Sequence, residues 1–341
     1  MSIHAGRWAW VALLPAVMLT TGVMAAETAV KFTLDFKFEG PSAPFLLALD
    51  KGYYRAEGLD VTVDASAGAL EPIERVASGA YDMGLADINS LIKARDAKPA
   101  TPIKAVFMLY NRPAYAVIGR KSRGINGPKD LENKILGAPS ADGAFTQWPI
   151  FVHANGIEAS KVKIENVGFP VREPMLAAGQ VDAITGFSFS SFIDLKEKGV
   201  PVDDLVVLLM ANYGVDLYGN AIIVNVKFAE EHADAVKGFL RAFTKSLKET
   251  VRQPASAIGS VLKRNVTANK NVELERLGMA IRDNIVSPEV KESGYGEIND
   301  VRFTRALEQI ALTYKFKAAK PKLEDVFDSS FLPSPAARRY K

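Results

Sequence analysis

The sequence of 341 residues contains no cysteine and only three histidines. The lack of cysteine excludes thiol nucleophiles, cysteine metal ligands, disulfides and a lipid-modified N-terminal cysteine. The histidines are His4, His153 and His232, and no two of them stand at a metal-ligand spacing. This scarcity disfavours a histidine metal site and a Ser–His dyad, so we expect no metal and no cofactor.

The sequence also lacks a strong charge of either sign. The formal net charge is +3, without a basic block, so nucleic acid is not an expected partner. Apolar residues make up 48% and charged residues 24%, which is typical of a globular protein. A chain of this length predicts two domains of ordinary size.

The N-terminus has the pattern of a secretory signal peptide. Arg7 precedes an uncharged run over residues 8–26, and small residues surround Ala25. We predict a signal peptide over residues 1–25, with cleavage after Ala25. The alternative is a membrane anchor, but Pro15 and the polar residues 20–22 weaken the run as a spanning helix. Without a cysteine after the cut, the predicted product is periplasmic and carries no lipid anchor.

From Val30 to Gly119, strand and helix patterns alternate. Strands are predicted at 30–36, 59–63, 81–86, 103–109 and 114–119, and helices at 43–57, 69–79 and 88–97. Gly58 is expected to end the first helix in a left-handed turn, with Tyr53 and Tyr54 packed in the core. This alternation predicts a mainly parallel sheet covered by helices.

The same alternation restarts after Gly119 and gives way to helices after Phe228. In the second block we predict strands at 135–139, 162–167, 181–187, 205–209 and 220–226, and helices at 127–134, 143–156, 171–180 and 190–199. The last part predicts helices at 228–251, 254–265, 271–285 and 300–316. The segments SGAYDMGLAD and AGQVDAITGF echo each other and suggest two similar lobes. The helical tail is expected to wrap back onto the first block.

Four segments carry a resemblance to a known family: 34–61, 74–92, 125–148 and 172–187. They resemble, in family order, the periplasmic substrate-binding proteins of ABC importers. The similar branch holds the nitrate, sulfonate and taurine binders and the thiamine-pyrimidine binding and synthesis proteins. The resemblance covers nearly all of the chain after the predicted signal peptide.

The resemblance implies an α/β fold of the type II periplasmic-binding-protein clamshell. Each lobe would be a mainly parallel sheet flanked by helices, with a helical C-terminal region. Lobe one would hold residues 27–119 and 225–341, and lobe two residues 120–224. Hinge crossovers are expected near 117–120 and 222–225, so that the lobes close on a ligand. The implied partners are a small molecule and a membrane permease, and we expect a monomer.

In open parallel sheets, ligands bind beyond the carboxyl ends of the strands. The loops expected there are rich in aromatic, hydroxyl and acidic residues, which suit a flat small molecule. Taken singly, a loop phenylalanine is more often part of the core, and Asp87 or Asp142 is more often a helix cap. The candidate ligand-binding residues are Phe36, Phe38, Glu39, Ser42, Ser66, Gly68, Asp87, Asn89, Ser140, Asp142, Phe145, Thr146, Phe187, Phe189, Tyr213, Asp216 and Tyr218.

The chain departs from its pyrimidine-binding relatives at the first of these loops. Phe36 stands where they usually carry tryptophan, and Ser42 where they carry histidine. The cysteine cluster of the pyrimidine-synthesising relatives is absent, which argues against their single-turnover synthase activity. These departures leave a binder but weaken the expectation of a pyrimidine ligand.

Three functions stay open. Acidic, aromatic loops favour a nitrogen heterocycle with N–H donors. An aromatic carboxylate or a sulfonate or taurine-like anion is the alternative, since helix N-termini near Ser42 and Gly143, with Arg112 and Arg172, can attract an anion. A secreted enzyme that uses Asp87 and Asp142 as paired acids is disfavoured, because no nucleophile–base pair supports it.

Overall fold

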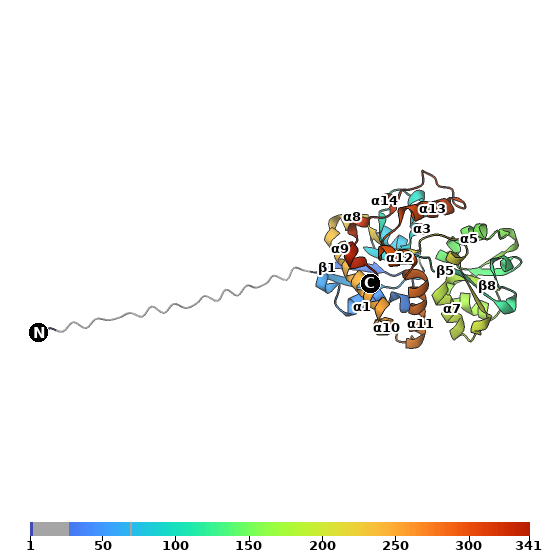
Figure 1. Ribbon diagram of the computed structural model, residues 1–341, viewed down its shortest axis with the longest axis horizontal. Helices are drawn as coiled ribbons and strands as arrows, with labels where there is room; N and C mark the ends of the chain where they lie inside the picture. Colours follow the sequence, from blue (N-terminus) through green and yellow to red (C-terminus); the bar gives the residue numbers. More distant parts are fainter. Residues whose placement is uncertain (3–26, 69) are drawn as a thin grey trace.

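The computed structural model describes residues 1–2, 27–68 and 70–341. It contains two five-stranded sheets, each flanked by helices (Figure 1). We call the sheet β2-β1-β3-β10-β4 with its helices lobe one, and the sheet β7-β6-β8-β5-β9 with its helices lobe two. Most of the predicted signal peptide, with the cleavage site after Ala25, lies outside the described residues.

The two sheets have the same topology. In each, four strands run in one direction and one strand, β10 or β5, runs against its two neighbours. The predicted mainly parallel sheets and the echo between the two blocks are therefore confirmed. The strands of lobe one are β1 (Thr28–Thr33), β2 (Leu59–Asp64), β3 (Met83–Asp87), β4 (Ile103–Met108) and β10 (Asn220–Asn225). Those of lobe two are β5 (Tyr115–Arg120), β6 (Ile135–Ala138), β7 (Lys163–Asn166), β8 (Ala183–Phe187) and β9 (Leu205–Leu209).

Short helices follow the strands in both lobes. Lobe one has α1 (Ala43–Asp50), α2 (Glu71–Ala77) and α3 (Ile88–Ala97), and lobe two has α4 (Gly143–Thr146), α5 (Trp148–Ala154), α6 (Phe169–Ala177) and α7 (Ser188–Glu197). The single helix predicted over 143–156 is in fact two helices, because Pro149 in the first turn of α5 cannot continue a preceding helix. Gly58 is left-handed as predicted, with a φ of 74°, but it ends a short 3-10 turn over residues 55–57, because the helix predicted over 43–57 already ends at Asp50. Buried Tyr54 stacks on Phe239 at 4.8 Å, as predicted.

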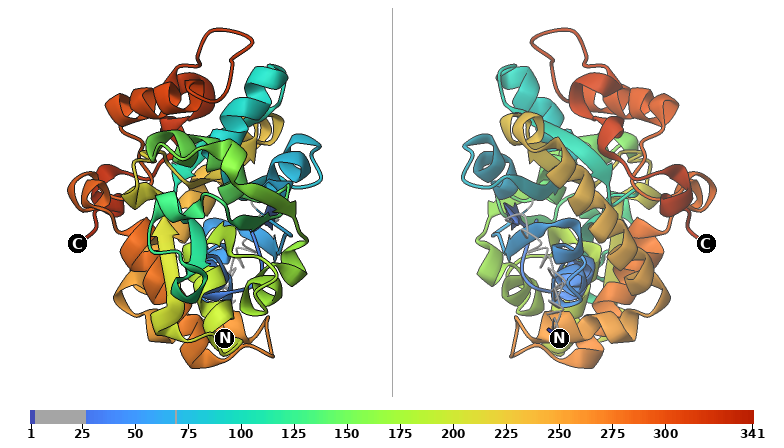
Figure 2. Two further views of the ribbon diagram at one scale, coloured as in Figure 1. Left: turned by 90° about the vertical axis from the view of Figure 1, so that its right-hand side faces the viewer. Right: turned by 90° about the vertical axis from the view of Figure 1, so that its left-hand side faces the viewer.

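The C-terminal region is helical and returns to lobe one (Figure 2). Phe243 of α9 stacks on Phe45 of α1 at 4.4 Å, and the Ser246 hydroxyl donates to the Pro44 carbonyl at 2.6 Å. The predicted helix over 228–251 is interrupted at His232, which leaves helical geometry. The helices are α8 (Val226–Glu231), α9 (Ala233–Arg252), α10 (Pro254–Leu262), α11 (Lys270–Ala280), α12 (Pro288–Ser293), α13 (Asp300–Ala311), α14 (Leu323–Val326) and α15 (Pro335–Arg338).

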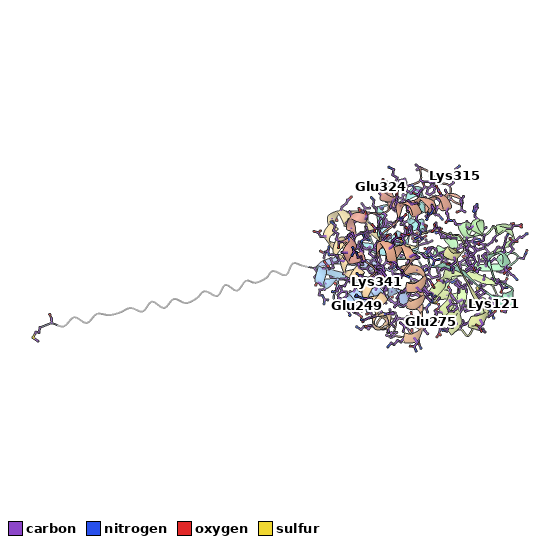
Figure 3. All side chains as sticks on the ribbon, in the orientation of Figure 1. Lys121, Glu249, Glu275, Lys315, Glu324 and Lys341 are labelled. Carbon is purple, nitrogen blue, oxygen red and sulfur yellow. The ribbon has the colours of Figure 1, made fainter. Side chains whose placement is uncertain are left out.

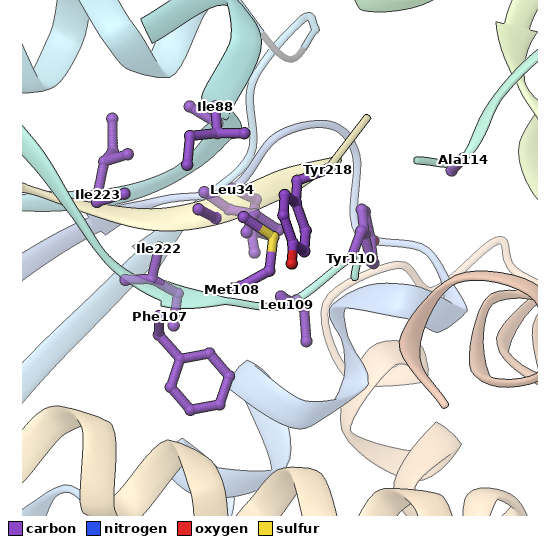
Figure 4. Packing of buried hydrophobic residues seen from close by; sticks show 14 of the residues in the cluster. Leu34, Ile88, Phe107, Met108, Leu109, Tyr110, Ala114, Tyr218, Ile222 and Ile223 are labelled. Atoms are coloured by element: carbon purple, nitrogen blue, oxygen red, sulfur yellow. The ribbon is translucent and has the colours of Figure 1, made fainter. Parts of the chain in front are cut away.

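Two segments connect the lobes, one over residues 109–114 and the other over 210–219. The crossovers therefore lie outside the positions predicted near 117–120 and 222–225, because those residues belong to β5 and β10. Both strands are hydrogen-bonded to a neighbouring strand on each side. Figure 4 shows the buried side chains at the start of the first crossover, where Leu109 and Tyr110 follow Phe107 and Met108.

The surface of the described residues is polar and carries charged side chains over both lobes (Figure 3). Within the described ranges, no helix combines the length and the apolar character that a membrane span requires.

Candidate ligand-binding site

A small cavity lies where the two lobes meet. It leaves about 10 Å³ of free space between the loop after β1 and the start of α7. Small-molecule sites usually offer roughly 300–1,000 Å³, so the lobes are closed here with their own side chains filling the space that a ligand would need. The lining residues are Asp35, Phe36, Lys37, Glu39, Pro41, Ser42, Tyr110, Phe187, Phe189 and Ser190.

Aromatic rings from both lobes form the walls. Phe36 of lobe one meets Phe187 of lobe two edge to face, with ring centroids 6.2 Å apart and planes at 87°. Phe187 lies 5.5 Å from Phe189, which in turn lies 6.0 Å from Tyr110 in the first crossover. Phe169 of α6 closes the group, 6.1 Å from Phe36. These rings give the cavity apolar walls whose positions depend on both lobes.

Asp35 is a buried acid at the end of a hydrogen-bond chain. The Asn220 amide nitrogen donates to Asp35 Oδ2 at 2.8 Å, and the Tyr115 hydroxyl donates to Asn220 Oδ1 at 2.8 Å. Tyr115 belongs to lobe two, so the chain links the lobes. Burial raises the pKa of Asp35 to about 7, although the Asn220 hydrogen bond opposes the change. The carboxyl group is therefore partly protonated near neutral pH and can donate as well as accept.

Glu39 is the second acid of the cavity and also contacts both lobes. Its Oε2 accepts from the Ser190 hydroxyl of lobe two at 2.5 Å and lies 3.6 Å from Arg276 Nη1. Burial raises the pKa of Glu39, and the charge of Arg276 opposes that effect. Ser42 supports the same loop, since its hydroxyl donates to the Glu39 carbonyl at 2.7 Å.

Asp87 is occupied by protein donors. It caps α3 by accepting from the backbone N–H groups of Asn89 and Ser90, and it also accepts from both of their side chains. The Gln147 amide of lobe two donates to Asp87 Oδ2 at 3.1 Å. Asp87 is thus a helix cap, as the alternative in the sequence analysis predicts, and it also joins the two lobes through Gln147.

Asp142 is occupied in the same way. It caps α4 through the Ala144 N–H at 3.1 Å, accepts from the Thr185 hydroxyl at 2.6 Å and lies 3.6 Å from Arg172. Arg172 is itself held by Glu173, at 2.6 Å. Burial raises the pKa of Asp142 against the opposing charge of Arg172. Asp142 and Arg172 are therefore both engaged by other side chains of lobe two.

Several predicted residues support the cavity without lining it. The Ser66 N–H donates to the Phe36 carbonyl at 3.1 Å. Gly68 faces Phe169 so closely that an added Cβ would lie 3.0 Å from the ring. Asn89 donates to the Tyr218 carbonyl at 2.7 Å. The others named in the sequence analysis at these loops are Phe38, Phe145 and Thr146, all half-buried, and Ser140, which is exposed.

Three predicted residues lie in the second crossover, where Asp216 and Tyr218 face the C-terminal helices and Tyr213 faces α5 of lobe two. Asp216 pairs with Arg302 at 3.1 Å, and the Tyr218 hydroxyl donates to Glu289 at 2.7 Å. Tyr213 packs on Phe151, with centroids 6.3 Å apart. The structure therefore separates Tyr213, Asp216 and Tyr218 from the cavity, because α12 and α13 hold the crossover from the other side.

Of the predicted residues, the structure brings Phe36, Glu39, Ser42, Phe187 and Phe189 together at the cavity. Sequence reasoning missed Asp35, Lys37, Pro41, Tyr110 and Ser190. Asp35 lies near the end of the strand predicted over 30–36, and Tyr110 directly follows the strand predicted over 103–109; those positions were the available signal. Within the described part of the chain, no three histidine or acidic side chains are grouped so as to hold a metal ion.

Comparison with known sequences identifies the family to which the chain belongs and several of its relatives. Residues 40–257 match the family model described as "NMT1/THI5 like". The formylaminopyrimidine-binding protein of Halalkalibacterium halodurans is 26% identical over 75% of this chain and 78% of its own. The riboflavin-binding protein RibY of Chloroflexus aurantiacus is 26% identical over 63% and 60%. The 4-amino-5-hydroxymethyl-2-methylpyrimidine phosphate synthase of Schizosaccharomyces pombe is 28% identical over 62% of each chain.

Solved structures share the fold at lower identity. The alkanesulfonate-binding protein SsuA of Xanthomonas axonopodis, bound to MOPS, has a TM-score of 0.66 at 15% identity, covering 90% of this chain and 99% of its own. The nitrate-binding protein NrtA of Synechocystis has a TM-score of 0.67 at 12% identity, covering 89% and 87%. These likenesses show the periplasmic-binding-protein fold. The chain belongs to the NMT1/THI5-like family.

Proposed function

We propose that this protein is the periplasmic solute-binding component of an ABC importer, and that it delivers a pyrimidine-like nitrogen heterocycle to a membrane permease. The observation that carries the proposal is the cavity between the lobes, where Phe36 and Phe187 meet edge to face beside the buried acids Asp35 and Glu39. The names of the pyrimidine- and riboflavin-binding relatives support the same ligand class.

The chemistry of the cavity suits an aminopyrimidine edge. Such an edge presents an amino donor next to a ring-nitrogen acceptor. A protonated carboxyl group presents the matching acceptor and donor, and the raised pKa of Asp35 keeps that form populated near neutral pH. The flat ring would stack on the face of one of the rings Phe36 and Phe187 and meet the edge of the other, because the two planes are nearly perpendicular.

An anionic ligand fits less well. Lys37 is the one cation among the described residues that line the cavity, and two acids line it as well. Arg276 and Arg172, which lie nearby, are already paired with carboxylates. A carboxylate or sulfonate would therefore meet unfavourable charge at Asp35 and Glu39 unless both were protonated.

One relative is named as a pyrimidine phosphate synthase, but we propose that this protein binds its ligand without catalysis. The proposed acid pair, Asp87 and Asp142, is already filled by helix-capping and side-chain donors. The sequence has no cysteine, whereas the pyrimidine-synthesising relatives carry a cysteine cluster. We therefore propose a carrier that releases its ligand unchanged.

The crossovers at 109–114 and 210–219 would act as the hinge of this carrier. Opening about them separates Phe36 from Phe187 and admits the ligand, and closing rebuilds the walls around it. The closed form, presenting both lobes at once, would dock on the permease. Export through the predicted signal peptide, without a lipid anchor, would place the carrier in the periplasm.

A thermal-shift panel followed by calorimetry tests the proposal. The panel holds 4-amino-5-hydroxymethyl-2-methylpyrimidine, riboflavin, benzoate, taurine and nitrate. We expect the heterocycles to stabilise the protein, and Phe187→Ala to weaken their binding about tenfold or more. Phe228→Ala is the control and should bind the heterocycles normally. Its half-buried ring lies at the start of the C-terminal region and contacts His232, with ring centroids 4.9 Å apart. Stabilisation by the small anions alone, with binding unchanged in Phe187→Ala, would refute the aromatic site.

A further inference from the structure

Arg276 lies on α11 of lobe one but makes polar contacts with both lobes. Its side chain is nearly inaccessible, with the residue 3% exposed. On its own lobe, Nε donates to Glu273 at 3.2 Å, and Nη1 lies 3.6 Å from Glu39. Across the boundary, Nη1 donates to the Ser190 carbonyl at 3.0 Å and Nη2 to Asp194 Oδ1 at 2.9 Å.

The Phe189 carbonyl accepts from Nη1 as well, at 3.4 Å, and all three lobe-two partners lie on α7, the helix whose first residues form one wall of the cavity. Figure 1 shows α7 and α11 side by side where the lobes meet. Ser190 lines the cavity, and its hydroxyl donates to Glu39. Arg276 therefore holds the backbone of one cavity wall from behind, while its ion pair with Glu39 holds the other.

The same cluster is tied to the loop after β1. The Gly40 N–H donates to Glu273 Oε2 at 2.6 Å, and an added Cβ at Gly40 would lie 2.2 Å from the Glu273 carbonyl. The loop that carries Glu39 thus sits directly on α11. Arg276 and Glu273 lie one turn apart on α11, and Glu273 in turn binds Gly40, the residue after Glu39. These contacts connect the pairing of Arg276 to the position of Glu39.

The surroundings explain why this contact depends on closure. A guanidinium has five N–H donors and no acceptor, and a buried one is costly unless those donors are met. With the lobes closed, Glu273, Asp194 and the carbonyls of α7 meet them. If the lobes open, α7 withdraws its acceptors, and only Glu273 and Glu39 remain for Arg276 within lobe one.

We propose that Arg276 is a positioning residue that latches α7 of lobe two onto α11 of lobe one and thereby sets how tightly the site holds its ligand. The role of this contact in holding a ligand rests on the proposed function. The experiment that detects the contact does not need that function to be correct. The latch acts on the equilibrium between open and closed lobes, which exists with or without ligand. The contact between α7 and α11 can therefore be measured in the ligand-free protein.

The test measures the distance between the lobes by double electron–electron resonance. Because the protein lacks cysteine, Lys121→Cys on lobe two and Lys270→Cys on α11 give a single pair of exposed spin-label sites. We expect the ligand-free parent to populate closed lobes. Arg276→Lys keeps the charge but loses the fork that reaches α7, and it should lower the closed-to-open ratio about tenfold or more.

Two further variants separate the latch from general stability. Asp194→Ala removes only the lobe-two partner and should lower the same ratio. Arg338→Lys is the matched control, because Arg338 is equally buried but bonds within lobe one to the carbonyls of Pro333 and Tyr295. It should leave the ratio unchanged.

An open parent protein, or equal closed fractions in the parent, Arg276→Lys and Asp194→Ala, would overturn the latch. These outcomes say nothing about which molecules bind. A failed ligand panel with an intact effect of Arg276→Lys would instead overturn the proposed function and leave the latch standing.

Discussion

Replacing Asp35 with asparagine should remove a specific part of the protein's pH dependence. In the folded protein, burial raises the pKa of Asp35 to about 7. In the unfolded chain the carboxyl titrates near pH 4. Between these values the folded state holds one proton more than the unfolded state, so its free energy of unfolding falls as the pH rises. The loss ends once the pH passes the folded pKa.

The magnitude follows from the pKa. Each pH unit of such linkage is worth about 1.4 kcal/mol, so raising the pH from 5 to 7 should cost about 2–3 kcal/mol through Asp35. Above pH 7 the contribution levels off. Asp35→Asn should not show this loss, because the amide is neutral at every pH and its oxygen can still accept from Asn220.

Urea denaturation followed by circular dichroism at pH 5 and pH 8 measures the effect. The quantity of interest is the change in the free energy of unfolding between the two values, compared between parent and variant, because other titrating groups then cancel. Asp60→Asn, a change to an exposed acid on β2, is the control and should keep the contribution of Asp35. Equal changes in the parent and in Asp35→Asn would show that the carboxyl is not held protonated, and the donor–acceptor account of the cavity would fail.

Three further substitutions have distinct expected outcomes. Gly40→Ala should lower the free energy of unfolding by about 3 kcal/mol in urea denaturation, because its Cβ would clash with the Glu273 backbone; a change under about 1 kcal/mol would contradict that contact. Asp142→Ala should cost about 3 kcal/mol, since Arg172 loses a buried partner. Tyr218→Phe should cost about 1 kcal/mol by losing the bond to Glu289, with ligand affinity measured by calorimetry unchanged; weaker binding would place Tyr218 at the site after all.

The alternation of strands and helices could be read from the sequence because each element carries its own periodicity. The strands of both sheets, the left-handed Gly58 and the buried Tyr54 were predictable from local patterns. Phe36 and Phe187 could be assigned to the cavity for a related reason. Both follow or end strands of the two sheets, and the carboxyl ends of parallel strands gather at one edge.

The remaining features depend on packing between distant segments. Arg276 lies in a helix whose sequence indicates only that it is helical, and its contact with Asp194 exists only because α11 meets α7. Tyr218 was expected at the cavity because its loop is aromatic. Its partner Glu289, which turns it away, lies 71 positions further along the chain. No local pattern predicts a contact over that separation.

The hinge illustrates a third limit. The family resemblance implied crossovers near 117–120 and 222–225, which lie inside β5 and β10. Pairing on both sides is a property of the assembled sheet. The crossovers at 109–114 and 210–219 therefore emerge only from the strand order.

Hydrogen exchange with and without ligand tests the central claim most directly. The protein is saturated with the panel heterocycle that stabilises it most, and amide protection is followed by mass spectrometry. The account predicts increased protection at residues 35–42 of lobe one and 185–191 of lobe two together, because the ligand lies between them. Protection confined to one lobe, or absent from both segments, would contradict a site shared between the lobes.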